Sequence, residues 1–302
     1  MKKSLFVFCL FAATRLFGNG VYLGLENDCL LQQHRDEDYT HGTEFRVEYD
    51  DWKFKVQQNM YTPDDITRYD HIEGDRPYCG MLIGGIGKEL FKKPTEFSPW
   101  THYLEVNFGM IGPSAHCKET QRLIHKWLDC REPNGWDNQL HDEFVVNAQW
   151  WTKYNYYMFD KWVALVPRGG AAVGTIQDFG ELGCDLKVGW NLENDVGNTI
   201  SFSSYPLKKS HWYDNMVLYV YAGMSERVYL YNHILQGSLF QNKDRDLGVQ
   251  IETLVGQAQV GAVLKLYGLY VTWYGVFRTK EYCDQKKAPD YGGLCIGYQW
   301  DF

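Results

Sequence analysis

The feature that most constrains this chain is the alternation of apolar and polar residues along its extended segments. In WTHYLEVNFGM, residues 100–110, one face carries Trp100, Leu104, Val106, Phe108 and Met110, and the other carries Thr101, Glu105 and Asn107. The same period of two recurs in TEFRVEYD (43–50) and LYVTWYGVFRTK (269–280). A period of two indicates strands with one apolar and one polar face, so the sequence predicts an all-β protein.

Two all-β architectures fit this pattern, a membrane barrel and a water-soluble sandwich. Aromatic residues make up 16% of the chain while its mean hydropathy is −0.42, which fits strands between lipid and water, a secreted sandwich or a carbohydrate-binding protein. The last segment, CIGYQWDF, places Ile296, Tyr298, Trp300 and Phe302 on one face and ends on an aromatic residue. Such a final strand resembles the insertion signal of bacterial outer-membrane barrels, so we expect a membrane barrel.

We expect a closed antiparallel 12-stranded transmembrane β-barrel with a short extracellular-loop helix over its mouth, because closed bacterial barrels have an even number of strands. The predicted strands span 21–28, 42–50, 52–61, 78–90, 99–112, 141–157, 160–173, 178–192, 213–235, 247–265, 268–282 and 291–302. With both chain ends periplasmic, the extracellular connections are 29–41, 62–77, 113–140, 237–246 and 283–290.

Residues 1–20, MKKSLFVFCLFAATRLFGNG, read as a secretory signal peptide: two lysines, an apolar run and then small residues. Residues 21–302 are then the barrel of the mature chain. No other segment has eighteen consecutive apolar residues, which excludes a helical membrane protein. The net charge of −8 argues against nucleic acid as a partner, and no protein partner is evident.

Seven of the eight cysteines follow the leader, an odd number that leaves at least one thiol unpaired in an oxidising compartment. Cys117 and Cys130 bracket a predicted loop helix, and Cys283 and Cys295 bracket the last extracellular connection. We expect a disulfide in each pair, although sequence alone cannot establish connectivity.

The segment CKETQRLIHKWLDC, residues 117–130, has a helical pattern. Gln121, Ile124, His125 and Leu128 fall on one face at spacings of three and four. Such a helix can pack on the barrel mouth and bury its Gln–His pair. A lone histidine on a helix more often packs or hydrogen-bonds than catalyses, so this pattern by itself does not indicate an enzyme.

The segment ENDCLLQQHRDEDYTHG, residues 26–42, carries five acids. Acids this close repel one another unless water, a cation or an arginine compensates the charge. A solvated loop is the default for such a run, and Asp36, Glu37 and Asp38 fit that interpretation.

Five motifs occur in order: ENDCLL…DEDYTHG, YTPDDITRYDHIEGDRPYCG, IGPSAHCKETQRLIHKWL, GWDNQLHDE and VFRTKEY. Together they closely resemble the outer-membrane lipid A 3′-O-deacylase family, over about residues 25–302. Cys79 departs from the family pattern, in which alanine is usual at this position.

The resemblance implies a barrel in the bacterial outer membrane, with its site facing the outer leaflet. It implies calcium-dependent hydrolysis of the ester that links the 3′ acyloxyacyl group to lipid A of lipopolysaccharide. The implied active-site residues are Asn27, Asp28, Thr40, Gln121 and His125. Arg68 falls near the family's substrate-contacting basic position, and Glu132 lies one residue out of register with a further functional acid.

Elementary chemistry agrees with this assignment. Ester hydrolysis needs a base for water and a positive centre for the oxyanion. His125 can act as the base near neutral pH, and Asn27, Asp28 and Thr40 offer hard oxygens for a calcium ion that polarises the carbonyl. No Gly-x-Ser-x-Gly elbow occurs, which disfavours an α/β serine hydrolase and leaves an outer-membrane Ser–His lipase open.

Two other functions remain open. An outer-membrane phospholipase is separable from the deacylase only by its substrate, and a non-catalytic pore-type barrel needs neither the Gln–His helix nor the Asn-Asp pair.

Three further features have structural interpretations. Asp75-Arg76-Pro77 predicts a turn and an ion pair rather than a catalytic dyad. Arg278 and Lys280 either bind phosphates or pair with Glu44 and Glu48. NLENDVGN (191–198) repeats Glu-Asn-Asp at a predicted periplasmic turn, which we attribute to chance.

Overall fold

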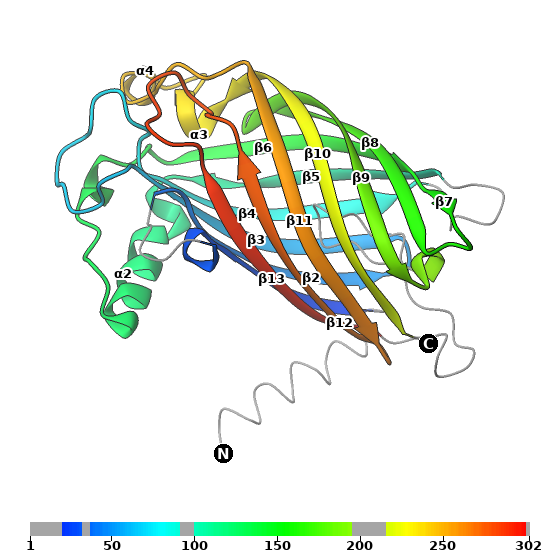
Figure 1. Cartoon of the computed structure of the whole chain (residues 1–302). Helices are drawn as coiled ribbons and strands as arrows, with labels where there is room; N and C mark the ends of the chain where they lie inside the picture. Colours follow the sequence, from blue (N-terminus) through cyan, green and yellow to red (C-terminus); the bar gives the residue numbers. More distant parts are fainter. Residues whose placement is uncertain (1–19, 32–36, 91–99, 195–215, 300–302) are drawn as a thin grey trace.

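The chain forms a closed antiparallel β-barrel (Figure 1), seen in a computed structural model that describes residues 20–31, 37–90, 100–194 and 216–299. The strands are β1 (Gly20–Asn27), β2 (Asp38–Tyr49), β3 (Trp52–Thr62), β4 (Cys79–Glu89), β5 (Trp100–Ile111), β6 (Glu143–Tyr154), β7 (Tyr156–Met158), β8 (Val163–Gly174), β9 (Gln177–Trp190), β10 (Val217–Asn232), β11 (Leu254–Leu266), β12 (Leu269–Arg278) and β13 (Asp290–Gln299).

Twelve strands make the wall, because β6 and β7 are consecutive parts of one strand interrupted at Asn155, and both pair with β8. Each other strand pairs with its neighbours in sequence, and pairing of β1 with β13 joins the two ends of the chain. The predicted strand number and antiparallel closure are therefore confirmed.

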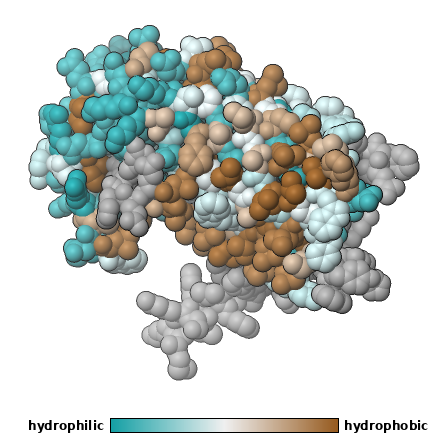
Figure 2. All heavy atoms as spheres, viewed as in Figure 1, coloured by the Kyte–Doolittle hydropathy of each residue, from teal (hydrophilic) through white to brown (hydrophobic). Residues whose placement is uncertain are grey.

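The predicted faces are confirmed as well, because large apolar side chains point outward along every long strand. Exposed examples are Leu23, Leu25, Phe45, Phe54, Val56, Ile86, Leu104, Val106, Phe108, Leu186, Val188, Val220, Val260, Trp273, Phe277 and Ile296. Figure 2 shows brown, hydrophobic atoms over the strands and teal, hydrophilic atoms at the end that carries the longer loops. This is the surface of a barrel that faces lipid.

The barrel interior is filled by tyrosines and by ion pairs between strands. Buried pairs include Arg46 with Glu48 at 3.2 Å, Lys53 with Glu89 at 2.9 Å and Lys55 with Glu105 at 2.8 Å. Farther round the wall, Glu181 accepts hydrogen bonds from both Arg168 and Arg227. These pairs compensate charges that lie away from water.

Most loops and helices gather at one end of the barrel (Figure 1), which we call the loop end. Its elements are η1 (Asp28–Leu30), η2 (Pro113–Ala115), α2 (Cys117–Leu128), η3 (Gly135–Asn138), α3 (His233–Gln236) and α4 (Asn242–Arg245). At the opposite end lies η4 (Leu192–Asn194). Among the described residues, no helix has the length and apolar character needed to cross a membrane.

Strand boundaries differ from the predicted ones mainly at the loop end. β2 begins at Asp38 rather than at residue 42, whereas β11 begins at Leu254 rather than at 247. The segment before β11 instead packs on α3, with the Val249 amide donating to the Leu235 carbonyl. The predicted leader, Trp300 and Phe302 lie outside the described residues.

The expected disulfides are wrong, because all seven cysteines of the described residues are free. Cys117 begins the 12-residue α2 and Cys130 follows its end. Such a helix is about 18 Å long, whereas disulfide-bonded Cα atoms lie within roughly 7 Å. Cys295 is buried in the barrel five residues along β13, whereas Cys283 is exposed in the loop before that strand.

The ion pairs of the interior give a stability prediction. Glu181→Ala should lower the free energy of unfolding by about 3–5 kcal/mol. The variant removes the carboxylate shared by the buried Arg168 and the partly buried Arg227, and among the described residues Arg168 alone keeps a second carboxylate partner, Asp185. Glu193→Ala is the matched control, because Glu193 pairs at 3.3 Å with Lys161 in an exposed bridge and should cost about 1 kcal/mol or less. Urea unfolding of both variants in lipid vesicles measures the difference, and equal losses would contradict the account.

Candidate active site

The first group of predicted site residues lies where β1 ends at the loop end. Asn27 terminates β1 and caps η1, because its Oδ1 accepts the Cys29 amide at 2.8 Å. Its Nδ2 donates to the Thr40 carbonyl at 2.8 Å. The buried carboxylate of Asp28 accepts the Cys29 and Glu37 amides at 2.8 and 2.9 Å. These bonds hold the Asn-Asp pair against the start of β2.

Thr40 joins this group through a β-bulge. The β2–β3 register shifts between Tyr39 and His41, so Thr40 is the extra residue. Bulges of this kind often re-aim a side chain next to an active site. The Thr40 hydroxyl lies 2.6 Å from the Thr62 hydroxyl, and both side chains are buried.

The strand-end group faces the outside of the barrel. Along β1, Asn27 is an even number of residues from the outward-facing Leu23 and Leu25. Along β3, Thr62 is likewise an even number of residues from the outward-facing Phe54 and Val56. Neighbouring side chains on a strand alternate between faces, so residues an even number apart share one face. The predicted residues therefore border the lipid-facing wall rather than the barrel interior.

The second group lies on α2, which packs against this same outer face. The Gln58 amide of β3 donates to the Ala115 carbonyl at 2.7 Å, and Met60 clusters with Cys117 and Trp136. We expected the helix over the barrel mouth, and that placement is wrong (Figure 1). The chain leaves β5 through η2 and turns onto the outside of β3 and β4.

Gly80 permits this close approach. A Cβ atom at Gly80 would lie 2.9 Å from the Cβ and 3.0 Å from the Sγ of Cys117, which leaves no room for a side chain. The Cys117 thiol points to the Asn59 carbonyl at 3.3 Å, and burial raises its pKa to about 12. This thiol is therefore a packing group at neutral pH.

The two predicted helix residues are both buried. Gln121 Oε1 accepts the Trp136 indole at 2.6 Å, while its Nε2 is buried with no hydrogen-bond partner among the described residues. His125 Nδ1 lies 2.5 Å from the Arg131 carbonyl. Because a carbonyl only accepts, Nδ1 carries the proton and Nε2 carries the lone pair.

β3 connects the two groups. Thr62, which holds Thr40, lies two residues along the same outward face from Met60, which packs with Trp136 and Cys117 under α2. The structure therefore brings the predicted Asn-Asp-Thr and Gln–His sets to one outer corner of the loop end, from segments about a hundred residues apart in sequence.

The other two predicted residues, Arg68 and Glu132, lie at the edge of this corner. Arg68 is half-exposed and pairs with Asp70 at 2.6 Å, although its carbonyl would lie 3.0 Å from a Cβ at Gly135, beside Trp136. Glu132 is exposed, 3.8 Å from Arg122 on α2. Neither side chain is buried with the helix pair.

The oxygen donors of the strand-end group suit calcium in kind. Calcium accepts carboxylate, amide and main-chain oxygens together with water, and Asp28, Asn27 and Thr40 supply the first three. A carboxylate oxygen has lone pairs for both an amide and a cation. The described residues hold no group of three or more His, Cys, Asp or Glu placed to bind a metal, and Asp28 is the acidic member of this group.

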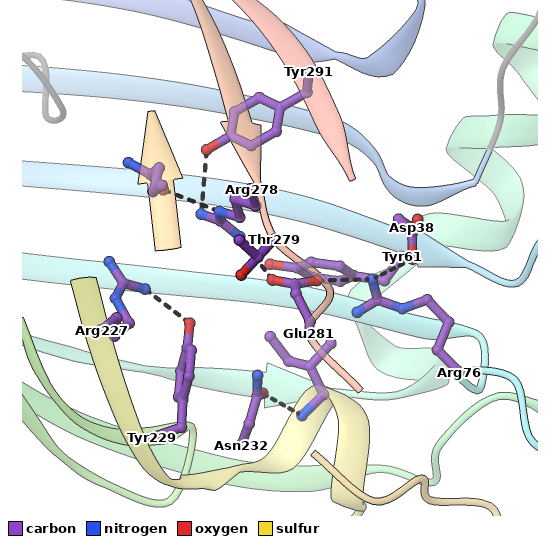
Figure 3. Close-up of polar contacts among 12 residues, drawn as sticks. Asp38, Tyr61, Arg76, Arg227, Tyr229, Asn232, Arg278, Thr279, Glu281 and Tyr291 are labelled. Carbon is purple, nitrogen blue, oxygen red and sulfur yellow. Dashed lines mark hydrogen bonds and ion pairs between the residues drawn. The ribbon is translucent and has the colours of Figure 1, made fainter. Parts of the chain in front are cut away.

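A second polar cluster lines the barrel interior near the loop end (Figure 3). Arg76 lies 3.5 Å from Asp38 and 3.6 Å from Glu281, and Arg278 lies 2.9 Å from Glu281. Each guanidinium therefore has a carboxylate partner. Arg76 forms ion pairs with these distant acids, whereas its neighbour Asp75 accepts the Arg76 backbone amide at 2.8 Å. The cluster has the composition of a structural network.

Two interpretations of acidic and basic residues change here. Asp38 was expected in a solvated run, but it is buried and accepts the Gln285 amide at 2.7 Å. Arg278 was expected to pair with Glu44 and Glu48 or to bind phosphates. Instead, Arg46 pairs with Glu44 at 3.5 Å and with Glu48 at 3.2 Å.

Sequence reasoning missed the residues that position the site. Trp136, Thr62 and Gly80 all lie inside motifs quoted above, but their roles depend on packing between distant segments. His41 was also missed. Its Nδ1 lies 3.5 Å from Asn27 Nδ2, and its Nε2 lies 2.8 Å from the Thr43 hydroxyl.

The closed barrel with a lipid-facing belt and a loop helix docked outside defines an integral protein of the bacterial outer membrane. The chain belongs to the family described as outer membrane protein LpxR, whose family model matches residues 3–300. No curated protein sequence matches the chain.

Solved structures agree on the fold. LpxR from Salmonella typhimurium matches with a TM-score of 0.78 at 19% identity, covering 93% of this chain and 100% of that one. The beta domain of the Bordetella autotransporter BrkA gives a TM-score of 0.45 at 8% identity, covering 94% and 99%. The Pseudomonas putida toluene transporter TodX gives 0.35 at 10% identity, covering 95% and 90%. The last two likenesses are too weak to support an inference.

The contact at Gly80 gives a prediction about the helix. Gly80→Val should displace α2 and increase tryptic cleavage at Lys118, Arg122 and Lys126. The barrel should stay folded, so that boiled and unheated samples still migrate differently on a mild detergent gel. Gly84→Val is the matched control, since a Cβ there would meet Phe108 at an ordinary 3.5 Å. Equal cleavage of Gly80→Val and wild type would refute the docking.

Proposed function

We propose that this protein is a lipid A 3′-O-deacylase, which hydrolyses the ester that links the 3′ acyloxyacyl group to lipid A. The carrying observation is the buried Gln121–His125 pair on a helix docked to the lipid-facing wall, beside the Asn27, Asp28 and Thr40 group. Membership of the LpxR family and the ordered motifs support the same assignment.

The position of the site suits a membrane lipid as substrate. A lipid reaches an outward-facing site by lateral movement in its leaflet, with its acyl chains still in hydrocarbon. The barrel interior is instead filled by paired charges and tyrosines. We infer that the loop end faces the outer leaflet, where lipopolysaccharide lies.

His125 is the proposed general base. Its Nε2 carries the lone pair, because Nδ1 donates to the Arg131 carbonyl. Nε2 takes a proton from water as the hydroxide oxygen bonds to the ester carbonyl carbon. When the tetrahedral intermediate collapses, the bond between that carbon and the sugar 3′ oxygen breaks, and His125 returns the proton to the leaving oxygen.

Gln121 is placed to stabilise the developing negative charge. Trp136 fixes the amide by donating to Oε1, and the buried Nε2 lacks a protein partner among the described residues. A fixed donor that is unpaired before substrate binds offers its hydrogen bonds to an oxyanion without reorganisation.

Calcium is the proposed cofactor, and Asp28, Asn27 and Thr40 are the residues that would hold it. When bound, calcium supplies a positive charge that polarises an ester carbonyl. The amide bonds from Cys29 and Glu37 position the Asp28 carboxylate, and the Thr62 hydroxyl positions Thr40. Arg68 and Glu132 are proposed at the substrate-facing rim, where phosphates and sugar hydroxyls of a lipid A head group would lie.

Loss of the base should abolish most activity. His125→Ala should lower release of the 3′ acyl group by roughly 10²–10⁴-fold, and Gln121→Ala should lose less, because an amide orients but takes no proton. Mass spectrometry of lipid A measures release of the 3′ acyl group by each purified variant. The variants used are those whose gel mobility changes on boiling, which shows that the barrel is folded. His71→Ala, a loop histidine outside the site, is the control. If folded His125→Ala released the 3′ acyl group at the wild-type rate, the proposed mechanism would be wrong.

Removal of divalent cations tests the second half of the site. A chelator should silence the wild-type enzyme and added calcium should restore it, and Asp28→Ala should lose activity to a similar degree as His125→Ala. Thr40→Ala and Asn27→Ala should also fall. Full activity in chelator would rule out calcium, and hydrolysis of phospholipid but not lipid A would favour a phospholipase instead.

A further inference from the structure

The helix α2 presents three different flanks. The first, at Cys117, contacts the barrel wall at Gly80 and Asn59. The second carries Lys118 and Arg122, and the third carries large apolar side chains. On this apolar flank Leu123 is 49% exposed and Trp127 76%. Leu128, in the last turn on the face of Gln121 and His125, is 68% exposed.

The basic flank is covered by the segment that follows the helix. Lys118 pairs with Asp137, and Arg122 lies 3.8 Å from Glu132. Trp136 and the Arg131 carbonyl come from the same segment and reach Gln121 and His125. The chain thus covers the helix from the wall round to its basic flank and leaves the apolar flank uncovered by the described residues.

The covering segment also shows which way the apolar flank faces. Residues 131–138 are bonded to the loop between β3 and β4: the Asn134 amide donates to the Ile66 carbonyl at 2.8 Å, and Asn138 Nδ2 donates to the Tyr69 carbonyl at 2.5 Å. Both segments lie beyond the strand ends, so they cover α2 from the loop end. The uncovered flank lies on the side of the helix away from this covering segment.

Large exposed apolar side chains need a partner, because isolated patches of this size on a helix mark an interaction surface. Here the patch lies on a helix whose first residue packs against Met60 of β3, on the outer wall that carries the large apolar side chains. Figure 2 shows brown atoms where α2 lies, outside the barrel wall. A helix with one apolar and one charged flank, next to a membrane, is typical of an interfacial helix.

We propose that the hydrocarbon edge of the membrane leaflet covers Leu123 and Trp127 on the apolar flank of α2, together with the exposed Leu128 at its C-terminal end. The helix then lies in the membrane interface with its basic flank toward the head groups. Resting on the proposed deacylase function, the same flank forms the lip of the entrance through which acyl chains slide toward Gln121 and His125.

Photocrosslinking tests the membrane contact without using activity. Benzoyl-phenylalanine replaces Trp127, Leu128, Lys126 or Phe45 in separate full-length proteins, each inserted in phosphatidylcholine vesicles. Phe45 on the barrel belt is the positive control, and Lys126, on the polar side of the same helix, is the matched negative control. We expect lipid adducts by mass spectrometry at positions 127, 128 and 45, with at least about a fivefold lower yield at 126. No adduct at 127 and 128 while 45 reacts, or equal yields at 126 and 127, would overturn the proposal.

A kinetic arm tests the entrance. The Trp127→Ser, Leu128→Ser double variant should raise KM for vesicle-embedded lipid A roughly 10-fold and leave kcat unchanged, because it weakens access and not the chemical step. A loss confined to kcat would refute the lip. If the wild-type protein hydrolyses no lipid A, the proposed function fails, and the crosslinking still decides whether α2 enters the membrane.

Discussion

The pairing of backbone groups within lipid is the constraint on which this structure depends. An unpaired amide or carbonyl costs several kcal/mol in hydrocarbon, so the wall must close on itself, as β1 does on β13. Because the apolar side chains of the closed wall point outward, the charged side chains of the strands point inward. There the charges of Glu181, Arg168 and Arg227 compensate one another. A barrel of this size filled by such pairs leaves its chemistry to be built outside, where strand ends and loops meet lipid.

The outer corner is assembled by a few contacts that differ in kind. Gly80 lets the start of α2 touch the wall, Trp136 fixes Gln121 from the opposite side, and the bulge at Thr40 turns that hydroxyl toward Thr62. Each contact joins segments far apart in sequence. The geometry of this corner therefore depends on the barrel keeping its register, and on residues such as Gly80 that touch neither Gln121 nor His125.

Much of the wall was predictable from the sequence, because lipid on one side and ion pairs on the other impose a strict period of two, as in Trp100–Met110. The Asn-Asp and Gln–His residues were identified by motif resemblance. Their meeting on the outer face was not, since the helical pattern shows which residues share a face and not which surface that face meets. Asp38 was misplaced because its burial is decided by tertiary neighbours, Arg76 and Gln285.

The account's central claim is that the reacting ester lies outside the barrel, between α2 and the ends of β1 to β3. A crystal structure of His125→Ala bound to lipid A in the presence of calcium tests this claim directly. The account predicts the 3′ ester carbonyl within hydrogen-bonding distance of Gln121 Nε2 and near Thr40, with acyl chains running along the outer wall past Leu128. Lipid A phosphates bound instead among Arg76, Arg227 and Arg278 inside the barrel, with the outer corner empty, would contradict it.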